Sequence, residues 1–175
     1  MADGPPNATG LTDRALPRLL FDLGLRRAEA VRLDVEDLDL QAGTVDVLGK
    51  GRSQKVRLTL PQPTREALAV WLAIRGGQLG PLFTSCDRAG KGSGRLTGSA
   101  VYTIVRRLGA QAGLAKVRPH GLRHTAITEA LDLTNGDVRA VQRFSRHRDL
   151  RTLQRYDDCR RDLGGEVAKR LGEGT

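Results

Sequence analysis

Apolar residues recur at helical spacing near the start of the chain. The first stripe has the i, i+3, i+4, i+7 spacing of an amphipathic helix and consists of Leu16, Leu19, Leu20 and Leu23. We expect folding to start near Asp13, with Pro17 in the first turn of this helix, where proline is tolerated. Gly24 is expected to end the helix, as glycine commonly does.

A second pattern, of period two, follows in the first third of the chain. Apolar residues alternate with polar ones, as in a half-buried strand, at Val45 and Val47 and again at Val56, Leu58 and Leu60. Gly49, Lys50 and Gly51 lie between the two runs. The pattern predicts an antiparallel hairpin with Lys50 at its turn.

The rest of the chain alternates between helical stripes and polar linkers. A short helix is expected over residues 27–33, and a longer one capped by Thr64 should run to about Ile74. Residues 76–98 are rich in glycine, serine and charge, which predicts a long surface loop. Later helices are indicated around residues 101–108, after Pro119, and in two or three shorter pieces.

These elements predict a mainly α fold with a small antiparallel β-sheet, of the α+β class. Residues 1–12 contain almost nothing apolar and are expected to be a disordered tail. Residues 13–161 are expected to form one domain, since 175 residues can bury a core without disulfides or metal. Residues 162–175 form a C-terminal helix or tail.

Charge favours a polyanionic partner. The formal net charge is +9 and the pI is about 10.5, which makes nucleic acid the first candidate, although ribosomal and other soluble proteins are also basic. Cys86 and Cys159 have no zinc-site spacing and are expected to be free thiols. No membrane-length apolar run or signal-peptide core is present, so we expect a soluble, cytoplasmic protein. No glycine-rich nucleotide-binding sequence opens a helix.

Six residues could carry chemistry, although each alone has an ordinary structural explanation. In chain order they are Arg26, Lys50, His120, Arg123, His147 and Tyr156. His120 and Arg123 would stand one turn apart at a helix start, where an anion is well received. His147 and Tyr156 are nine residues apart in a basic run.

Together these residues resemble the active site of the tyrosine recombinases, also called phage-type integrases. The family pattern is G-L-R-x-x-E, a lysine on a hairpin turn, H-x-L-R-H-T, and a histidine followed by a tyrosine about nine residues later. Here the first segment reads Gly24-Leu25-Arg26-Arg27-Ala28-Glu29 and the third reads His120-Gly121-Leu122-Arg123-His124-Thr125. The resemblance covers residues 13–161 and implies the catalytic domain of that family.

The resemblance implies DNA cleavage through a covalent 3′-phosphotyrosyl bond to Tyr156, followed by rejoining without ATP. Arg26 and Arg123 would stabilise the charge that gathers on the nonbridging oxygens of the transition state. His147 would add a hydrogen bond there. His120 is the family's candidate to take the tyrosine proton, and Lys50 its candidate to protonate the leaving 5′-oxygen.

Further roles follow from the same resemblance. Glu29 would orient Arg26, or else form an ordinary i, i+3 pair, and His124 is expected to be structural. Because arginines and a lysine supply the charge and the protons, we expect no cofactor and no metal dependence. The expected partners are double-stranded DNA and other protomers assembled on it. Candidate phosphate contacts, each of which could instead be a solvated surface charge, are Arg88, Lys91, Arg95, Arg106, Arg107, Arg143 and Arg148.

The last helix leaves two arrangements open. Leu163, Val167 and Leu171 lie one turn apart. By resemblance they would dock on a neighbouring protomer, and the alternative is that they pack on their own domain.

Two features depart from the family pattern. Family members usually have glycine just before the second histidine, where this chain has Arg146. A left-handed backbone there would cost about 1–2 kcal/mol relative to glycine. Typical members also carry an N-terminal core-binding domain for which this sequence has no room, so it is either a fragment or a minimal recombinase like the fimbrial phase-variation invertases.

Rival functions remain at this stage. A type IB topoisomerase uses a similar residue set to relax DNA, and a noncatalytic DNA-binding module would use only the basic surface. A metal-dependent nuclease ranks last, because the paired carboxylates that it needs are missing from the sequence.

Overall fold

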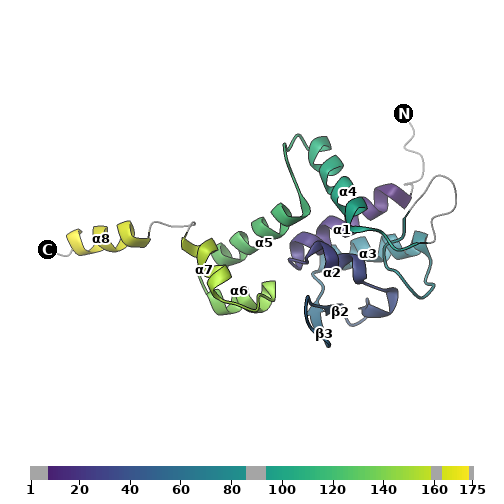
Figure 1. Ribbon diagram of the computed structural model, residues 1–175, viewed down its shortest axis with the longest axis horizontal. Coiled ribbons are helices and arrows are strands. Elements are labelled where there is room, and N and C mark those ends of the chain that lie inside the picture. The colour runs from purple at the N-terminus through teal and green to yellow at the C-terminus, as the bar shows by residue number, and fades with distance from the viewer. Residues whose placement is uncertain (1–7, 86–93, 159–162, 174–175) are drawn as a thin grey trace. The chain divides into compact units, whose positions relative to one another are not determined.

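The computed structural model describes residues 8–85, 94–158 and 163–173, and its contacts divide the chain into two compact units (Figure 1). The first unit is residues 1–124 and the second is residues 125–175. Both are mainly helical, and the first holds a three-stranded antiparallel sheet. The predicted fold class is therefore confirmed.

The first unit contains most of the elements. In chain order they are helices α1 (Ala8–Asp22) and α2 (Arg27–Arg32), the 3-10 turn η1 (Val35–Asp37), strands β1 (Leu38–Asp39), β2 (Thr44–Leu48) and β3 (Lys55–Thr59), and helices α3 (Gln62–Arg75) and α4 (Gly98–Gln111). Helix α5 (Pro119–Leu133) begins in the first unit and ends in the second. The second unit continues with α6 (Val138–Ser145), α7 (Arg151–Asp158) and α8 (Leu163–Glu173).

The core of the first unit forms where α1 packs against α3. The predicted leucine stripe of α1 is buried, as the helical period requires. Trp71 of α3 stacks on Phe83 with ring centroids 5.8 Å apart. Its indole Nε1 donates to the carbonyl of Leu82 at 2.8 Å, which fixes residues 82–83 against the helix.

Helix α1 begins at Ala8, five residues before the expected start at Asp13. Residues 8–12 are therefore helical rather than a tail, and residues 1–7 lie outside the described part of the chain. Pro17 lies inside the helix, so the prediction that it occupies the first turn is wrong. The apolar stripe begins only at Leu16, so it does not predict that the helix extends back to Ala8. Thr12, in this extension, is buried.

Two further local predictions differ from the structure, one entirely and one in part. Thr64 does not cap α3, which begins at Gln62; its hydroxyl instead donates to Asp22 Oδ2 at 2.5 Å and ties α3 to the end of α1. The segment 76–98 is more than a surface loop. Leu82 and Leu96 lie in the core, and the Leu96 amide donates to the carbonyl of Phe83 at 2.8 Å.

The predicted hairpin is confirmed. Strands β2 and β3 pair antiparallel, and Leu48 opposite Lys55 is the last pair before the turn. Val45 and Val47 are fully buried, as the alternation predicts. The sheet order is β1-β2-β3, so β3 is an edge strand.

The second unit has its own small core, formed by Ile127, Leu131, Val141 and Leu153. The partly buried ring of Tyr156 packs against this core. In contrast, Val167 and Leu171 of α8 are 57% and 72% exposed.

We expect Trp71→Phe to lower the free energy of unfolding by about 1–3 kcal/mol, because the buried Leu82 carbonyl loses its indole donor. Val70→Ala, a half-exposed position on the same helix, should cost less than about 1 kcal/mol. Urea denaturation of the chain measures both. Equal losses for the two variants would contradict the assigned role of the indole hydrogen bond.

Candidate active site

The first structural feature of the candidate site is the junction between α1 and α2. Gly24 adopts a left-handed backbone with φ 54°, which few other residues tolerate. Its amide donates to the carbonyl of Phe21 at 3.0 Å, as in a glycine helix cap. The chain can therefore end one helix and begin the next within a few residues, at Arg26.

Arg26 is the residue before the first turn of α2, and Glu29 holds it on two sides. Glu29 Oε2 accepts the Arg26 amide at 2.9 Å, and Oε1 accepts Nη1 of the Arg26 guanidinium at 2.8 Å. Glu29 is buried, whereas the Arg26 side chain keeps 29% of its surface exposed. A charge-assisted bond to a buried carboxylate orients the guanidinium while leaving part of it accessible.

Arg123 reaches the same junction from α5. It is only 4% exposed, and its Nη1 donates to the carbonyl of Gly24, two residues before Arg26. His120, one turn earlier on α5, is exposed. The first unit thus brings Arg123 to the segment that carries Arg26.

Lys50 lies where the sequence predicts it, on the turn between β2 and β3. The Arg52 amide donates to the carbonyl of Gly49 at 3.2 Å and closes the turn, and Gly51 supplies the positive φ of 71° that it needs. Lys50 is exposed. Its ammonium group is therefore available to an incoming ligand.

His147 and Tyr156 come together in the second unit. Their ring centroids are 6.3 Å apart at an interplanar angle of 37°. Ser145, which is fully buried, has its Oγ 2.9 Å from Nδ1 of His147. The Gln142 side-chain amide also donates to the His147 carbonyl at 3.2 Å, so both the backbone and the ring of His147 are held.

Arg146 occupies the left-handed position that the family fills with glycine. It caps α6 with φ 57° and ψ 32°, so the turn keeps the left-handed shape. The residue is buried, and its Nη1 donates to the carbonyl of Phe144 at 2.8 Å.

The basic residues expected to contact phosphates fall into three groups. Arg106, Arg143 and Arg148 are exposed, and Arg88 and Lys91 lie outside the described residues. Arg107 pairs with Asp13 at 2.5 Å. Arg95 makes internal contacts and keeps 35% of its side chain exposed: its guanidinium donates to Asp34 at 2.5 Å and to the carbonyls of Val31 and Leu33 at 2.9 and 3.1 Å.

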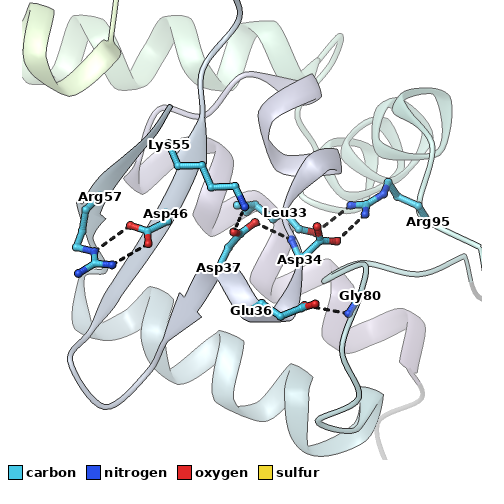
Figure 2. Close-up of polar contacts among 9 residues, drawn as sticks. All are labelled: Leu33, Asp34, Glu36, Asp37, Asp46, Lys55, Arg57, Gly80 and Arg95. Atoms are coloured by element: carbon cyan, nitrogen blue, oxygen red, sulfur yellow. Dashed lines mark hydrogen bonds and ion pairs between the residues drawn. The ribbon is translucent and has the colours of Figure 1, made fainter. Parts of the chain in front are cut away.

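Figure 2 shows a polar network that the sequence did not reveal, on the first unit. Lys55 of β3 donates to Asp37, whose other oxygen accepts the Asp34 amide at 3.0 Å. Asp34 in turn accepts from Arg95. The Asp-x-x-Asp spacing of residues 34 and 37 was the available signal, because it is typical of a reciprocal cap at a helix start. Ser145 was missed as well, since nothing in the sequence links it to His147.

The described part of the chain lacks two kinds of feature. Among residues 8–85, 94–158 and 163–173, no group of three or more His, Cys, Asp or Glu side chains could hold a metal ion. No helix within these ranges is long and apolar enough to cross a membrane.

Comparison with known proteins decides the family. The model of the phage integrase family matches residues 2–161, nearly the whole chain. The chain belongs to the phage integrase family. Among its relatives is a tyrosine recombinase of Synechococcus elongatus, 42% identical over 170 residues, an alignment that covers 95% of this chain and 53% of the relative. XerC of Pseudomonas aeruginosa is 40% identical over 148 residues, which are 82% of this chain and 46% of XerC.

Solved structures of phage integrase family relatives share the fold. The XerA recombinase matches with a TM-score of 0.70 and 26% identity, over 95% of this chain and 61% of XerA. XerH bound to a palindromic difH substrate, in a post-cleavage complex, matches with a TM-score of 0.73 and 26% identity, over 95% of this chain and 47% of XerH. This confirms the catalytic-domain fold, and the chain spans about half the length of the curated relatives it matches.

The Ser145 contact predicts a defined tautomer for this phage integrase family member. The hydroxyl can donate to Nδ1 or accept from it, and either hydrogen bond favours one tautomer of the ring over the other. Ser145→Ala should release the ring and give exchange-averaged ¹⁵N signals for His147. Thr152→Ala, which removes an exposed hydroxyl from α7, should leave those signals unchanged. Unaltered ring ¹⁵N shifts in Ser145→Ala would show that the serine does not set the tautomer.

Proposed function

We propose that this chain is the catalytic part of a site-specific tyrosine recombinase, which cleaves and rejoins double-stranded DNA through a 3′-phosphotyrosyl bond to Tyr156. The observation that carries the proposal is the pairing of His147 with Tyr156, 6.3 Å apart, in a member of the phage integrase family. A tyrosine beside a histidine is suited to phosphoryl transfer because the imidazole can donate a hydrogen bond to a phosphate oxygen. The XerH relative, a recombinase bound to its difH substrate in a post-cleavage complex, supports a DNA substrate.

In the proposed reaction the Tyr156 oxygen attacks phosphorus, and the bond from phosphorus to the 5′-oxygen breaks. Arg26 and Arg123 neutralise the negative charge that increases on the nonbridging oxygens as five bonds form around phosphorus. Guanidinium groups remain charged at any working pH and match two phosphate oxygens at once. Glu29 favours this role because it orients Arg26 before DNA binds.

Two protons must also move. His120 accepts the phenolic proton of Tyr156, and Lys50 gives a proton to the leaving 5′-oxygen. Rejoining reverses both transfers, so the phosphoester bond is conserved and no nucleotide is consumed. The exposure of Lys50 on its turn is compatible with reaching a bound duplex.

The remaining exposed cations would serve affinity. We propose that Arg106, Arg143 and Arg148 contact phosphates, each adding a salt-dependent, sequence-independent contribution to binding. A DNA substrate also implies that the protein acts where DNA lies, and we propose the cytoplasm.

The main test uses nicked suicide duplexes, taken from a DNA library when the cognate site is unknown. After cleavage the short nicked fragment diffuses away and rejoining fails, so the protein stays attached to DNA. In EDTA we expect a DNA-linked protein band on a denaturing gel that is absent in Tyr156→Phe, because phenylalanine lacks the attacking oxygen. Tyr102→Phe, at an exposed tyrosine of α4, is the matched control and should leave the band intact.

The other outcomes separate the rival functions. If the chain binds DNA in a gel shift but forms no covalent band, a noncatalytic DNA-binding module is the remaining function. Relaxation of supercoiled plasmid without strand exchange between two sites would favour a type IB topoisomerase-like activity. A covalent band that persists in Tyr156→Phe would show that Tyr156 is not the nucleophile.

We also propose that α8 contacts a neighbouring protomer on DNA, since its Val167 and Leu171 side chains are 57% and 72% exposed. Placing a charge there should weaken an apolar contact between protomers. Leu171→Glu is expected to reduce cooperative binding to a two-armed site in gel shifts at least severalfold. Leu133→Glu, at an equally exposed leucine of α5, should have no such effect. Cooperative binding unchanged by Leu171→Glu would indicate that α8 does not make this contact.

A further inference from the structure

The hairpin that carries Lys50 has little to restrain it near its turn. Strand β3 lies at the sheet edge, and its apolar residues Val56 and Leu58 are only partly buried. Lys55 pairs with Leu48, and these two residues flank the six-residue turn segment 49–54. Strand β1 pairs with β2 at Thr44 and Val45, the end of the hairpin away from the turn, so the position of the turn depends on what holds its base at Leu48 and Lys55.

An ion pair holds that base to the body of the first unit. The Lys55 ammonium group donates to Asp37, whose side chain is 6% exposed. Asp37 belongs to η1, outside the hairpin, so this contact reaches beyond the two strands (Figure 2). The hydrogen bond to Asp37 raises the pKa of Lys55 above its ordinary value, so the ammonium form that makes this contact persists to higher pH.

The same network continues to the segment that carries Arg26. Arg95 links Asp34 to the carbonyls of Val31 and Leu33, at the end of α2. Helix α2 begins next to Arg26, and Glu29 of that helix holds the Arg26 guanidinium. A cavity of about 280 Å³ is lined by Glu29, Asp37, Lys55 and Arg95. Glu29, which holds Arg26, and the Lys55–Asp37 pair next to the turn that carries Lys50 therefore line the same cavity.

We propose that Lys55 is a positioning residue: its ion pair with Asp37 holds the hairpin so that Lys50 meets the leaving 5′-oxygen in register with the phosphate bound at Arg26. The inference rests on the proposed function. A general acid must lie within hydrogen-bond reach of the atom it protonates, and a misplacement of about 1 Å can cost about a hundredfold in rate. Lys55 acts through Lys50 and does not touch the DNA.

A sulfur substitution separates this role from simple stabilisation of the fold. When the bridging 5′-oxygen of the suicide duplex is replaced by sulfur, the leaving group is a thiolate. A thiol has a pKa of about 8.5, far below that of an alcohol, so it departs without a proton from Lys50. A defect confined to leaving-group protonation disappears on this substrate, whereas a defect in folding or phosphate binding remains.

The experiment measures the rate of covalent-complex formation by the full chain on the oxygen and sulfur duplexes. We expect Lys55→Met to be slowed about tenfold to hundredfold on oxygen and to be close to the unaltered chain on sulfur, the same pattern as Lys50→Ala. Lys55→Arg, which keeps the charge, should restore most of the rate. Asp37→Asn removes the carboxylate but retains an acceptor for the Asp34 amide, and it should show the same two rates as Lys55→Met. Asp37→Asn takes the place of Lys55→Met if the latter does not fold.

Arg57→Met is the matched control. Arg57 pairs with Asp46 through two bonds of 2.9 and 2.8 Å, but both residues lie within the hairpin. Its loss should leave both rates within about twofold of the unaltered chain.

Three results would overturn the inference. Equal slowing of Lys55→Met on the two substrates would make Lys55 a stability residue only. Normal cleavage of the oxygen duplex by both Lys55→Met and Asp37→Asn, while Lys50→Ala is slow, would show that the ion pair does not position Lys50. Failure of sulfur to rescue Lys50→Ala would overturn both the general-acid role of Lys50 and this inference, while a Tyr156-dependent covalent band would still support the proposed function.

Discussion

The buried guanidinium of Arg123 is the constraint on which the first unit depends. A cation removed from water costs several kcal/mol unless acceptors replace the lost hydration. The Gly24 carbonyl supplies one acceptor, and it lies at the end of α1, outside the helical ladder. Glycine at this position therefore serves two purposes: its left-handed backbone ends α1, and its carbonyl meets the arginine from α5. Arg26, the residue before α2, follows Gly24 by two positions, so Arg123 is bound close to the segment that carries Arg26.

The candidate cations differ in how the fold holds them, and the difference matches the chemistry proposed for each. Arg123 is buried and Arg26 is clamped by Glu29, which suits groups that must stay aimed at a phosphate throughout the reaction. Lys50 lies exposed on a turn, which suits a group that must reach the 5′-oxygen both when it leaves and when it returns. A restraint next to the turn, at Lys55, reconciles exposure of the turn with a defined position.

The sequence predicts well those features that follow a period. The leucine stripe of α1 and the alternation of β2 are buried as expected, because burial on a helix or strand repeats every 3.6 or 2 residues. Polar links between distant segments carry no such period. Thr64 bonds to Asp22 across 42 positions, and Arg95 bonds to Asp34 across 61. Thr64 was predicted to cap α3 because a threonine near a helix start fits the capping pattern equally well. The candidate catalytic residues were found only through family resemblance, since each segment alone has a structural explanation.

The division into two units has a consequence for how the protein is made. A growing polypeptide leaves the ribosome N-terminus first, and units that have their own core tend to fold in that order. The unit that contains Arg26, Lys50, His120 and Arg123 is synthesised before the unit that contains His147 and Tyr156. A chain interrupted during translation would therefore contain the proposed phosphate-binding cations without the proposed nucleophile. If the proposed function holds, such a truncated product would lack Tyr156 and could not become covalently attached to DNA.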